Sequence, residues 1–187
     1  MKERTPALQR ALESPNSSNS WVDYFLAFEM KLDELNGHIL DIGSGKSDFG
    51  NKLMKMKEDA FVVRLNPHLV RPDHGTELDP ESNSPQVAAL VQEGLPFPDE
   101  CFDFVFSLHA VPKFIHGYEV EPMFEEVWRV LKKGGVGYFY PFAHLGESVT
   151  RFRNIHNSIA VEPIKEFLVP KDKTDDKRYT SRIVMRK

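Results

Sequence analysis

The segment ILDIGSGKSDF, residues 39–49, has the pattern of a buried strand that runs through a tight glycine turn into a helix. Residues 39–42 are mainly apolar, as in a strand that is covered on both faces of a sheet. Gly43 and Gly45 allow the backbone to turn sharply and carry no β-carbon that would obstruct a ligand. Apolar residues recur at helical spacing over residues 48–57. The segment therefore predicts an α/β fold with a ligand site at the turn.

Three classes of cofactor site use a strand, a glycine turn and a helix in this order. Gly45-Lys46-Ser47 imitates the end of a phosphate-binding P-loop, but Leu40 stands where that loop requires another glycine. The dinucleotide fingerprint requires a small residue three positions after Gly45, where Asp48 would instead face a pyrophosphate. A helix start presents free amide donors to polar atoms of a ligand, and the Asp41 carboxylate can accept hydrogen bonds from ligand amines or hydroxyls. The spacing therefore disfavours both phosphate-binding classes.

The remaining pattern, Asp41-Ile42-Gly43-Ser44-Gly45-Lys46-Ser47, resembles the first motif of the class I S-adenosylmethionine-dependent methyltransferases, with serine in place of the last glycine. Residues 95–107 resemble the family segment that leads into its fourth strand, and residues 124–135 resemble the helix end before its fifth strand. The resemblance covers about residues 37–140. It implies an α/β, Rossmann-like class I methyltransferase fold: a mostly parallel seven-stranded sheet flanked by helices, with N-terminal helices and an antiparallel C-terminal strand.

Composition fits one compact domain: the chain has 187 residues, 41% of them hydrophobic, and a net charge of −4. We expect a single methyltransferase-like domain, with residues 1–36 as an N-terminal helical cap and residues 37–187 as the Rossmann-like core. The acidic balance makes general nucleic-acid binding an unfavourable interpretation. A single cysteine, Cys101, excludes an intrachain disulfide, and no Cys/His cluster has metal-site spacing, so we expect no metal.

Targeting signals are missing from the sequence pattern. No apolar run approaches the ~20 residues of a membrane span. The polar start Met1-Lys2-Glu3-Arg4 is unlike a signal peptide. We therefore expect a cytoplasmic protein without membrane contact.

Apolar periodicity and turn residues locate the elements of the chain. We expect helices at residues 5–13, 21–35, 48–57 and 119–132 and around 146–153, and strands at residues 38–42, 61–65, 87–91, 102–106, 136–140, 159–169 and 178–186. Residues 66–85 lack a period and predict a long surface loop where the family has a helix. An aromatic stripe, Trp21, Phe25 and Phe28, could cover a small substrate, although core contact is the more ordinary role of such a stripe.

The family pattern implies that ligands bind at the carboxyl ends of the parallel strands. Asp41, Gly43, Ser44, Gly45 and Ser47 follow strand one and would hold the methionine part of S-adenosylmethionine. The other candidate cofactor residues lie near the ends of strands two, three and four: Arg64, Asn66, Gln92, Glu93 and Ser107. Of these, Gln92 or Glu93 would meet the adenine amine.

Arg64 departs from the family pattern, which has an acidic residue at the end of strand two to accept from both ribose hydroxyls. A guanidinium donates hydrogen bonds and cannot accept them. Arg64 could donate to ribose oxygens, pair with Asp41, or hold a 2′-phosphate as in some NADP folds. Asn66 could accept from one hydroxyl.

His109 is the candidate catalytic residue, because a histidine that titrates near neutral pH suits a general base. The alternative is that His109 caps a strand end or packs beneath the next loop. Residues 107–112 lack the Asn/Asp-Pro-Pro-aromatic signature of enzymes that methylate amide or adenine nitrogens. The methyl acceptor therefore stays open between a small molecule and an exposed macromolecular group.

Two functional hypotheses follow. The first is an S-adenosylmethionine-dependent methyltransferase that transfers a methyl group in line to its acceptor. The second is a methyltransferase-like fold that has weakened or lost cofactor binding and acts as a binding module or subunit, which Ser47, Arg64 and the missing helix after strand two motivate. NADP binding through Arg64 is a remote third hypothesis, since no substrate domain follows.

Overall fold

Seven strands form one sheet in the order β3-β2-β1-β4-β5-β7-β6. The computed structural model describes residues 20–67, 82–111, 115, 117–141, 158–164 and 181–187. The strands are β1 (Gly37–Ile42), β2 (Ala60–Leu65), β3 (Gln86–Val87), β4 (Phe102–Leu108), β5 (Leu131–Tyr140), β6 (Ile159–Pro163) and β7 (Ser181–Arg186). The first five strands in chain order pair in parallel, whereas β7 is antiparallel to β5 and to β6. The predicted Rossmann-like architecture with antiparallel C-terminal strands is confirmed.

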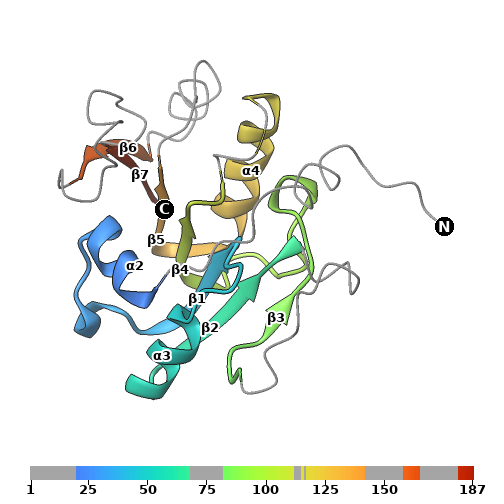
Figure 1. Ribbon diagram of the computed structural model, residues 1–187. Helices are drawn as coiled ribbons and strands as arrows, with labels where there is room; N and C mark the ends of the chain where they lie inside the picture. The colour runs from blue at the N-terminus through green and yellow to red at the C-terminus, as the bar shows by residue number, and fades with distance from the viewer. Residues whose placement is uncertain (1–19, 68–81, 112–114, 116, 142–157, 165–180) are drawn as a thin grey trace.

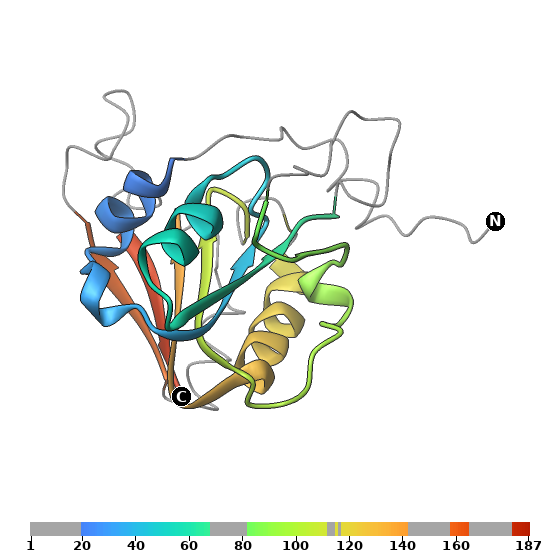
Figure 2. The same ribbon diagram turned by 90° about the horizontal axis from the view of Figure 1, so that it is seen from below.

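Helices cover both faces of the sheet (Figures 1 and 2). On one face lie α2 (Trp21–Phe28) and α3 (Phe49–Met56), and on the other lies α4 (Gly117–Val130). Each face has its own core, since one buried cluster joins α4 to the sheet and a second joins α2 and α3 to it. Strands β1 and β4 are central and contribute to both cores. This double coverage explains why residues 39–42 are apolar at nearly every position.

Parallel pairing brings the ends of β1 and β2 to the same edge of the sheet. Their register sets Asp41 beside Arg64 and Ile42 beside Leu65. Strand β4 lies on the other side of β1, with Phe106 opposite Asp41. The turn after β1 therefore lies between the ends of two neighbouring strands, which is the position that the sequence predicted for a ligand.

Helix α2 begins with a local hydrogen bond and ends earlier than predicted. The Ser20 backbone N–H donates to the Asp23 carboxylate (2.7 Å), which stabilises the first turn. Glu29 adopts a left-handed conformation (φ 51°), so the helix stops after Phe28. A separate short helix, η1 (Leu32–Glu34), follows. The apolar residues to position 35 were wrongly read as one helix, because the same spacing continues across the break.

The bounds of three further elements differ from the prediction. Strand β3 comprises only Gln86–Val87, and the 3-10 helix η4 (Val91–Glu93) occupies the end of the predicted strand 87–91. Strand β5 begins at Leu131 rather than at 136, because Leu131 pairs with Phe102 before an irregularity in register. The helix expected to reach 132 consequently ends at Val130.

Arg129 on α4 connects two of the sequence motifs. Its guanidinium donates to the backbone oxygens of Leu95 (3.0 Å) and Phe97 (2.8 Å). The same group pairs with Asp99 and with Glu126. The segment before β4 is thus attached to the helix before β5, which gives a structural role to residues that the family pattern shares.

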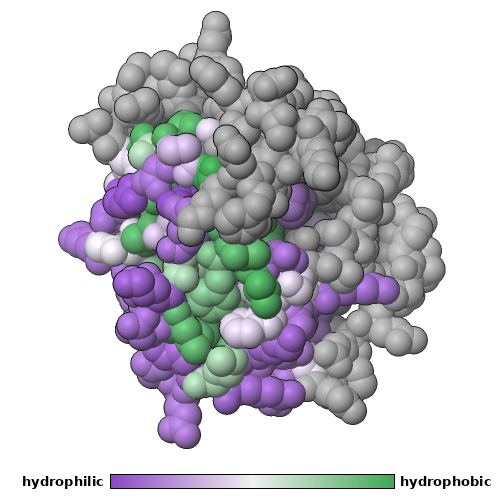
Figure 3. Space-filling view, turned by 60° about the vertical axis from the view of Figure 1, so that its left-hand side comes forward, coloured by the Kyte–Doolittle hydropathy of each residue, from purple (hydrophilic) through white to green (hydrophobic). Residues whose placement is uncertain are grey.

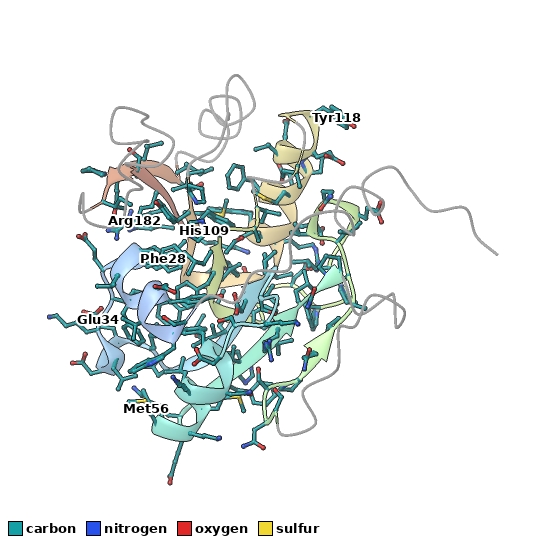
Figure 4. The ribbon with its side chains drawn as sticks, in the orientation of Figure 1. Phe28, Glu34, Met56, His109, Tyr118 and Arg182 are labelled. Atoms are coloured by element: carbon teal, nitrogen blue, oxygen red, sulfur yellow. The ribbon has the colours of Figure 1, made fainter. Side chains whose placement is uncertain are left out.

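The antiparallel strands are joined to α2 by Arg182 on β7. Its guanidinium donates to Glu162 on β6 (2.9 Å) and to the Ala27 backbone oxygen (3.4 Å). Figure 4 shows Arg182 and Phe28 from neighbouring elements on this side of the sheet. The predicted strands 159–169 and 178–186 are confirmed over β6 and β7, although β6 ends before Ile164. Residues 165–169 and 178–180, the predicted helices 5–13 and 146–153, and residues 68–81 of the predicted loop lie outside the described residues.

Large apolar side chains at the surface are spread over several elements: Val22, Met56, Phe61, Tyr118 and Val161. Figure 3 shows the side that carries α2 and α3, where apolar residues reach the surface between hydrophilic ones. Tyr118 projects outward from the start of α4 (Figure 4). Single apolar residues at a surface are ordinary. We assign no docking role to them.

Phe106 is at the centre of the aromatic core, since its ring contacts those of Tyr24, Phe28, Phe49, Phe104 and Tyr138. We predict that Phe106→Ala lowers the free energy of unfolding by about 3–5 kcal/mol in chemical denaturation, because it removes a fully buried ring and leaves a cavity. Phe61→Ala is the control: this ring, on β2, is 43% exposed, and its removal should cost less than about 1 kcal/mol. Equal losses for the two variants would contradict the described core.

Candidate functional site

Asp41 lies at the end of β1 with its carboxylate fully buried. The Tyr24 hydroxyl, from α2, lies 2.9 Å from one carboxylate oxygen and 3.0 Å from the other, and donates to this group. Burial raises the pKa of Asp41 to about 7, although the Tyr24 hydrogen bond and the charge of Arg64 both lower it. The first motif thus carries a carboxyl group that changes charge near neutral pH.

Tyr24 is held in place by aromatic rings from two other elements. Its ring stacks on Phe49 of α3 with centroids 4.2 Å apart and planes inclined by 3°, and it meets Phe106 of β4 edge-on. Burial raises the pKa of the Tyr24 hydroxyl well above its usual value, and the Asp41 charge raises it further. The sequence analysis did not identify Tyr24 as a site residue. The signal available was its position one helical turn before Phe28, which places both residues on the buried face of α2.

Arg64 is also buried, with 4% of its surface exposed, and lies beside Asp41 in the strand register. Its Nη2 donates to the Gly45 backbone oxygen (2.9 Å), and its Nε has no hydrogen-bond partner in the described part of the chain. Of the roles considered for Arg64, pairing with Asp41 is supported by the strand register and by the charge of Arg64, which lowers the pKa of Asp41. A role toward a ligand stays a prediction.

Asn66, rather than Arg64, is the first residue after β2. The strand ends at Leu65, as predicted, so Arg64 is its penultimate residue and lies near the strand end, as Asp41 does on β1. The buried Asn66 amide donates to the Gly45 oxygen over 3.4 Å. The side chains of Arg64 on β2 and of Asn66 just after it therefore both hold the glycine turn, through the Gly45 carbonyl.

The glycine turn is fixed by its own backbone and by the turn after β4. Gly43 and Ser44 donate their backbone N–H groups to the Leu65 oxygen (2.8 and 3.2 Å). Gly43 has φ 69°, and a β-carbon on it would collide with the β-carbon of Ala110. The glycine is thus required for a close approach within the protein, whereas the sequence had indicated space for a ligand there.

Two serines of the turn have different surroundings. The Ser47 hydroxyl accepts from the backbone N–H of Phe49 (3.2 Å), the first residue of α3. Asp48, the N-cap residue of α3, accepts instead from the backbone N–H of Trp21 (2.7 Å) and connects the starts of the two helices. The Ser44 hydroxyl is buried and finds no partner among the described residues. Ser44 and Arg64 thus each leave a buried donor to a ligand.

Ser107 and His109 stand at the carboxyl end of β4, next to β1. The buried Ser107 hydroxyl accepts from the Val111 backbone N–H (3.0 Å), which stabilises the turn after the strand. His109 adopts φ 57°, donates its backbone N–H to the Tyr140 oxygen (2.6 Å) and sets its ring edge-on to that of Tyr140. Figure 4 shows His109 near the centre of the molecule. The contact supports the packing role for His109, and its role as a base stays a prediction.

Gln92 and Glu93 are not at a strand end. They belong to η4, whereas β3 ends at Val87, and η4 packs against α4. The interpretation that both follow strand three directly was therefore wrong. Their predicted contact with an adenine amine stays untested.

The aromatic stripe of α2 divides between core and rim. Phe28 is buried in the core, while Trp21 and Phe25 are partly buried and pack against it. Trp21 meets Phe25 edge-on, and Phe25 meets Phe49. The ordinary role of such a stripe, contact with the core, holds for Phe28 and explains why Trp21 and Phe25 pack against the same cluster.

Within the described residues, no group of three His, Cys, Asp or Glu side chains could hold a metal ion. No helix in that part of the chain is both long enough and apolar enough to cross a bilayer.

The residues at the turn fit a nucleoside ligand with a cationic amino-acid tail. Asp41 supplies an anionic acceptor, and the Ser44 hydroxyl and the Arg64 Nε are buried donors that find no partner among the described residues. The site lies at the carboxyl ends of parallel strands, where open α/β sheets bind such ligands. The fold places the protein in the Rossmann-like structural class.

A profile of the methyltransferase domain family matches residues 40–139, just over half of the chain. The chain belongs to the methyltransferase domain family. Among curated relatives it is 29% identical over 140 residues to the ubiquinone/menaquinone biosynthesis C-methyltransferase UbiE of Rickettsia bellii, covering 69% of this chain and 52% of that protein. It is also 29% identical over 117 residues to the sterol 24-C-methyltransferase erg6 of Aspergillus fumigatus, covering 61% and 30%. The chain thus spans about half or less of these relatives.

Solved structures agree on the fold. A TehB-like SAM-dependent methyltransferase of Corynebacterium glutamicum aligns with a TM-score of 0.59 at 17% identity, covering 96% of this chain and 94% of that one. The PH0226 protein of Pyrococcus horikoshii aligns with a TM-score of 0.56 at 19% identity, covering 88% and 89%. The predicted family and fold are confirmed.

The raised pKa of Asp41 predicts a particular dependence of stability on pH. The folded protein holds this proton up to about pH 7, whereas the unfolded chain releases it near 4, so wild type loses stability between these values as the pH rises. Relative to Asp41→Asn, we predict that the unfolding free energy of wild type falls by at most about 4 kcal/mol from pH 4 to pH 8. Denaturant titrations across this range measure the difference. Parallel pH profiles for the two proteins would contradict a buried, shifted carboxyl.

Proposed function

We propose that this protein binds S-adenosylmethionine at the turn after β1 and transfers its methyl group to an acceptor that is a small molecule or an exposed macromolecular group. The observation that carries the proposal is the buried Asp41 beside a glycine turn with unpartnered donors on Ser44 and Arg64. Membership of the methyltransferase domain family supports it. The cofactor would supply an electrophilic methyl group on a sulfonium centre.

The residues of the chain would position this group rather than react with it. Asp41 accepts from the amino group of the cofactor, and the turn over Gly43 and Gly45 lies along its methionine part. Asn66 and the Arg64 Nε would hold the ribose oxygens, since both side chains come from the end of β2 and donate to the Gly45 carbonyl of the glycine turn. His109, at the neighbouring strand end, is the group that would remove an acceptor proton.

A second candidate function is a binding module whose cofactor affinity is weakened or lost. It is favoured by two contacts that the protein makes with its own turn: Arg64 donates to the Gly45 oxygen, and Ala110 occupies the space over Gly43. The first contact satisfies a carbonyl group of the turn, and the second fills space above it that a ligand would otherwise occupy. We favour the enzyme because the donors of Ser44 and Arg64 and the acceptor of Asp41 are still grouped at the turn.

We further propose that the protein acts in the cytoplasm. The single cysteine, Cys101, is a free thiol, which suits a reducing compartment. The net charge of −4 supports an acceptor other than bulk nucleic acid.

Calorimetric titration with S-adenosylmethionine and S-adenosylhomocysteine tests the enzyme against the binding module. We expect saturable binding at micromolar ligand for both compounds. Absence of heat at millimolar ligand, with the protein folded by circular dichroism, would reject the proposed cofactor and favour the second candidate.

Asn66 provides a site-directed test of the same proposal. We predict that Asn66→Ala weakens S-adenosylhomocysteine binding about fivefold, because one ligand hydrogen bond of about 1 kcal/mol is lost. Asn51→Ala is the matched control, since its amide oxygen accepts from Ser82 (2.7 Å) and the Ser84 backbone (3.3 Å) rather than lying at the turn. This variant should lose stability and keep its affinity. Unchanged binding by Asn66→Ala would remove Asn66 from the site.

A further inference from the structure

We propose that Tyr24 is a positioning residue for Asp41, so that α2 forms part of the cofactor site and Asp41 binds the ammonium group of the ligand only in its ionised form. This inference rests on the proposed function and adds a residue and a proton-coupled step to it. It starts from the contact of one hydroxyl with both oxygens of a fully buried carboxyl group.

The hydroxyl proton of Tyr24 can be donated to only one carboxylate oxygen at a time. The two oxygen–oxygen distances, 2.9 and 3.0 Å, are nearly equal, so neither oxygen of Asp41 is preferred by geometry. When Asp41 is ionised, Tyr24 satisfies one oxygen and leaves the other to accept from a ligand. When Asp41 is protonated, the carboxyl group is neutral and interacts with a cationic ligand group much more weakly.

Tyr24 cannot easily leave this position. Its ring is fully buried, stacked on Phe49 and edge-on to Phe28 and Phe106. The start of α2 is attached as well, because the Trp21 backbone N–H donates to the Asp48 carboxylate. The rings of α3 and β4 therefore determine where the hydroxyl lies, and the hydroxyl determines the orientation of the carboxyl group.

Among the residues that the structure describes, few charged or titratable groups face Asp41. They are Tyr24 from α2 and Arg64 from β2, with the neutral hydroxyl of Ser47 close to Tyr24, whereas β4 contributes the apolar Phe106. Burial opposes ionisation, and both Tyr24 and Arg64 favour it. The balance leaves Asp41 partly protonated near neutral pH, so binding of an ammonium group is accompanied by release of a proton to solvent.

The pH dependence of ligand affinity tests this inference in wild type. With the pKa of Asp41 at about 7, the ionised fraction rises about eightfold between pH 6 and 7.5, and the dissociation constant of S-adenosylhomocysteine should fall by the same factor. The control ligand is 5′-methylthioadenosine, which shares the adenosine and the thioether but has no amino-acid group. Its dissociation constant should change less than twofold over this range.

Tyr24→Phe removes the hydroxyl and retains the buried ring. We expect the midpoint of the S-adenosylhomocysteine profile to rise by about one pH unit, with affinity about fivefold lower at pH 7 and a smaller difference at higher pH. Tyr138→Phe is the matched control, because Tyr138 stacks in the same aromatic cluster and does not contact Asp41. It should leave the profile unmoved. A purely structural role of Tyr24 would lower the affinity equally at all pH values.

The outcomes separate this inference from the proposed function. If neither ligand binds, the proposed cofactor is wrong. If both ligands bind with the same pH profile, or if Tyr24→Phe leaves the S-adenosylhomocysteine profile unmoved, the role of Tyr24 is overturned. If Tyr24→Phe does not fold, the two profiles of wild type still decide, since a flat S-adenosylhomocysteine profile overturns the proton-coupled step.

Discussion

The parallel pairing of β1 with β2 and β4 is the constraint on which the rest of the structure depends. Parallel strands in register deliver their carboxyl ends to one edge, and this places Asp41, Arg64 and Phe106 side by side. The glycine turn must then pass over these ends while it makes hydrogen bonds to Leu65 and a close contact with Ala110. Without that pairing the charged residues of β1 and β2 would have no reason to meet.

Burying a carboxyl group and a guanidinium at this edge is costly unless each finds partners. The protein meets the requirement in part: Tyr24 donates to Asp41, Arg64 donates to the Gly45 oxygen, and the two charges face one another. The Arg64 Nε and the Ser44 hydroxyl stay unpartnered within the described residues. Incomplete satisfaction of buried polar groups is common where a ligand completes the network, which is why the same turn supports the cofactor proposal and the proton-coupled binding at Asp41.

The family resemblance and the physical site agree in most respects and differ at β2. The family pattern has an acidic residue at the end of this strand, which would present two acceptors to a ribose, whereas this chain has the cation Arg64 there and Asn66 two residues later. The charge of Arg64 lowers the pKa of Asp41, and its guanidinium donates to the Gly45 oxygen of the turn, so its presence changes the electrostatics of the site without removing the acceptor. The methyltransferase fold is thus retained around a differently charged centre.

The sequence by itself determined the strand, glycine turn and helix of residues 37–56 and strand β2, because these depend on local periodicity and turn chemistry. Its motifs indicated the family and, through the resemblance, a mostly parallel sheet. Only the tertiary structure decided that α2 stops at Glu29, that β3 is short and that β5 starts at Leu131, since these boundaries follow from packing and strand register. It also decided the partner of Asp41. Tyr24 lies 17 residues away along the chain, and no local pattern reveals a hydrogen bond that exists only after α2 packs against Phe49 and Phe106.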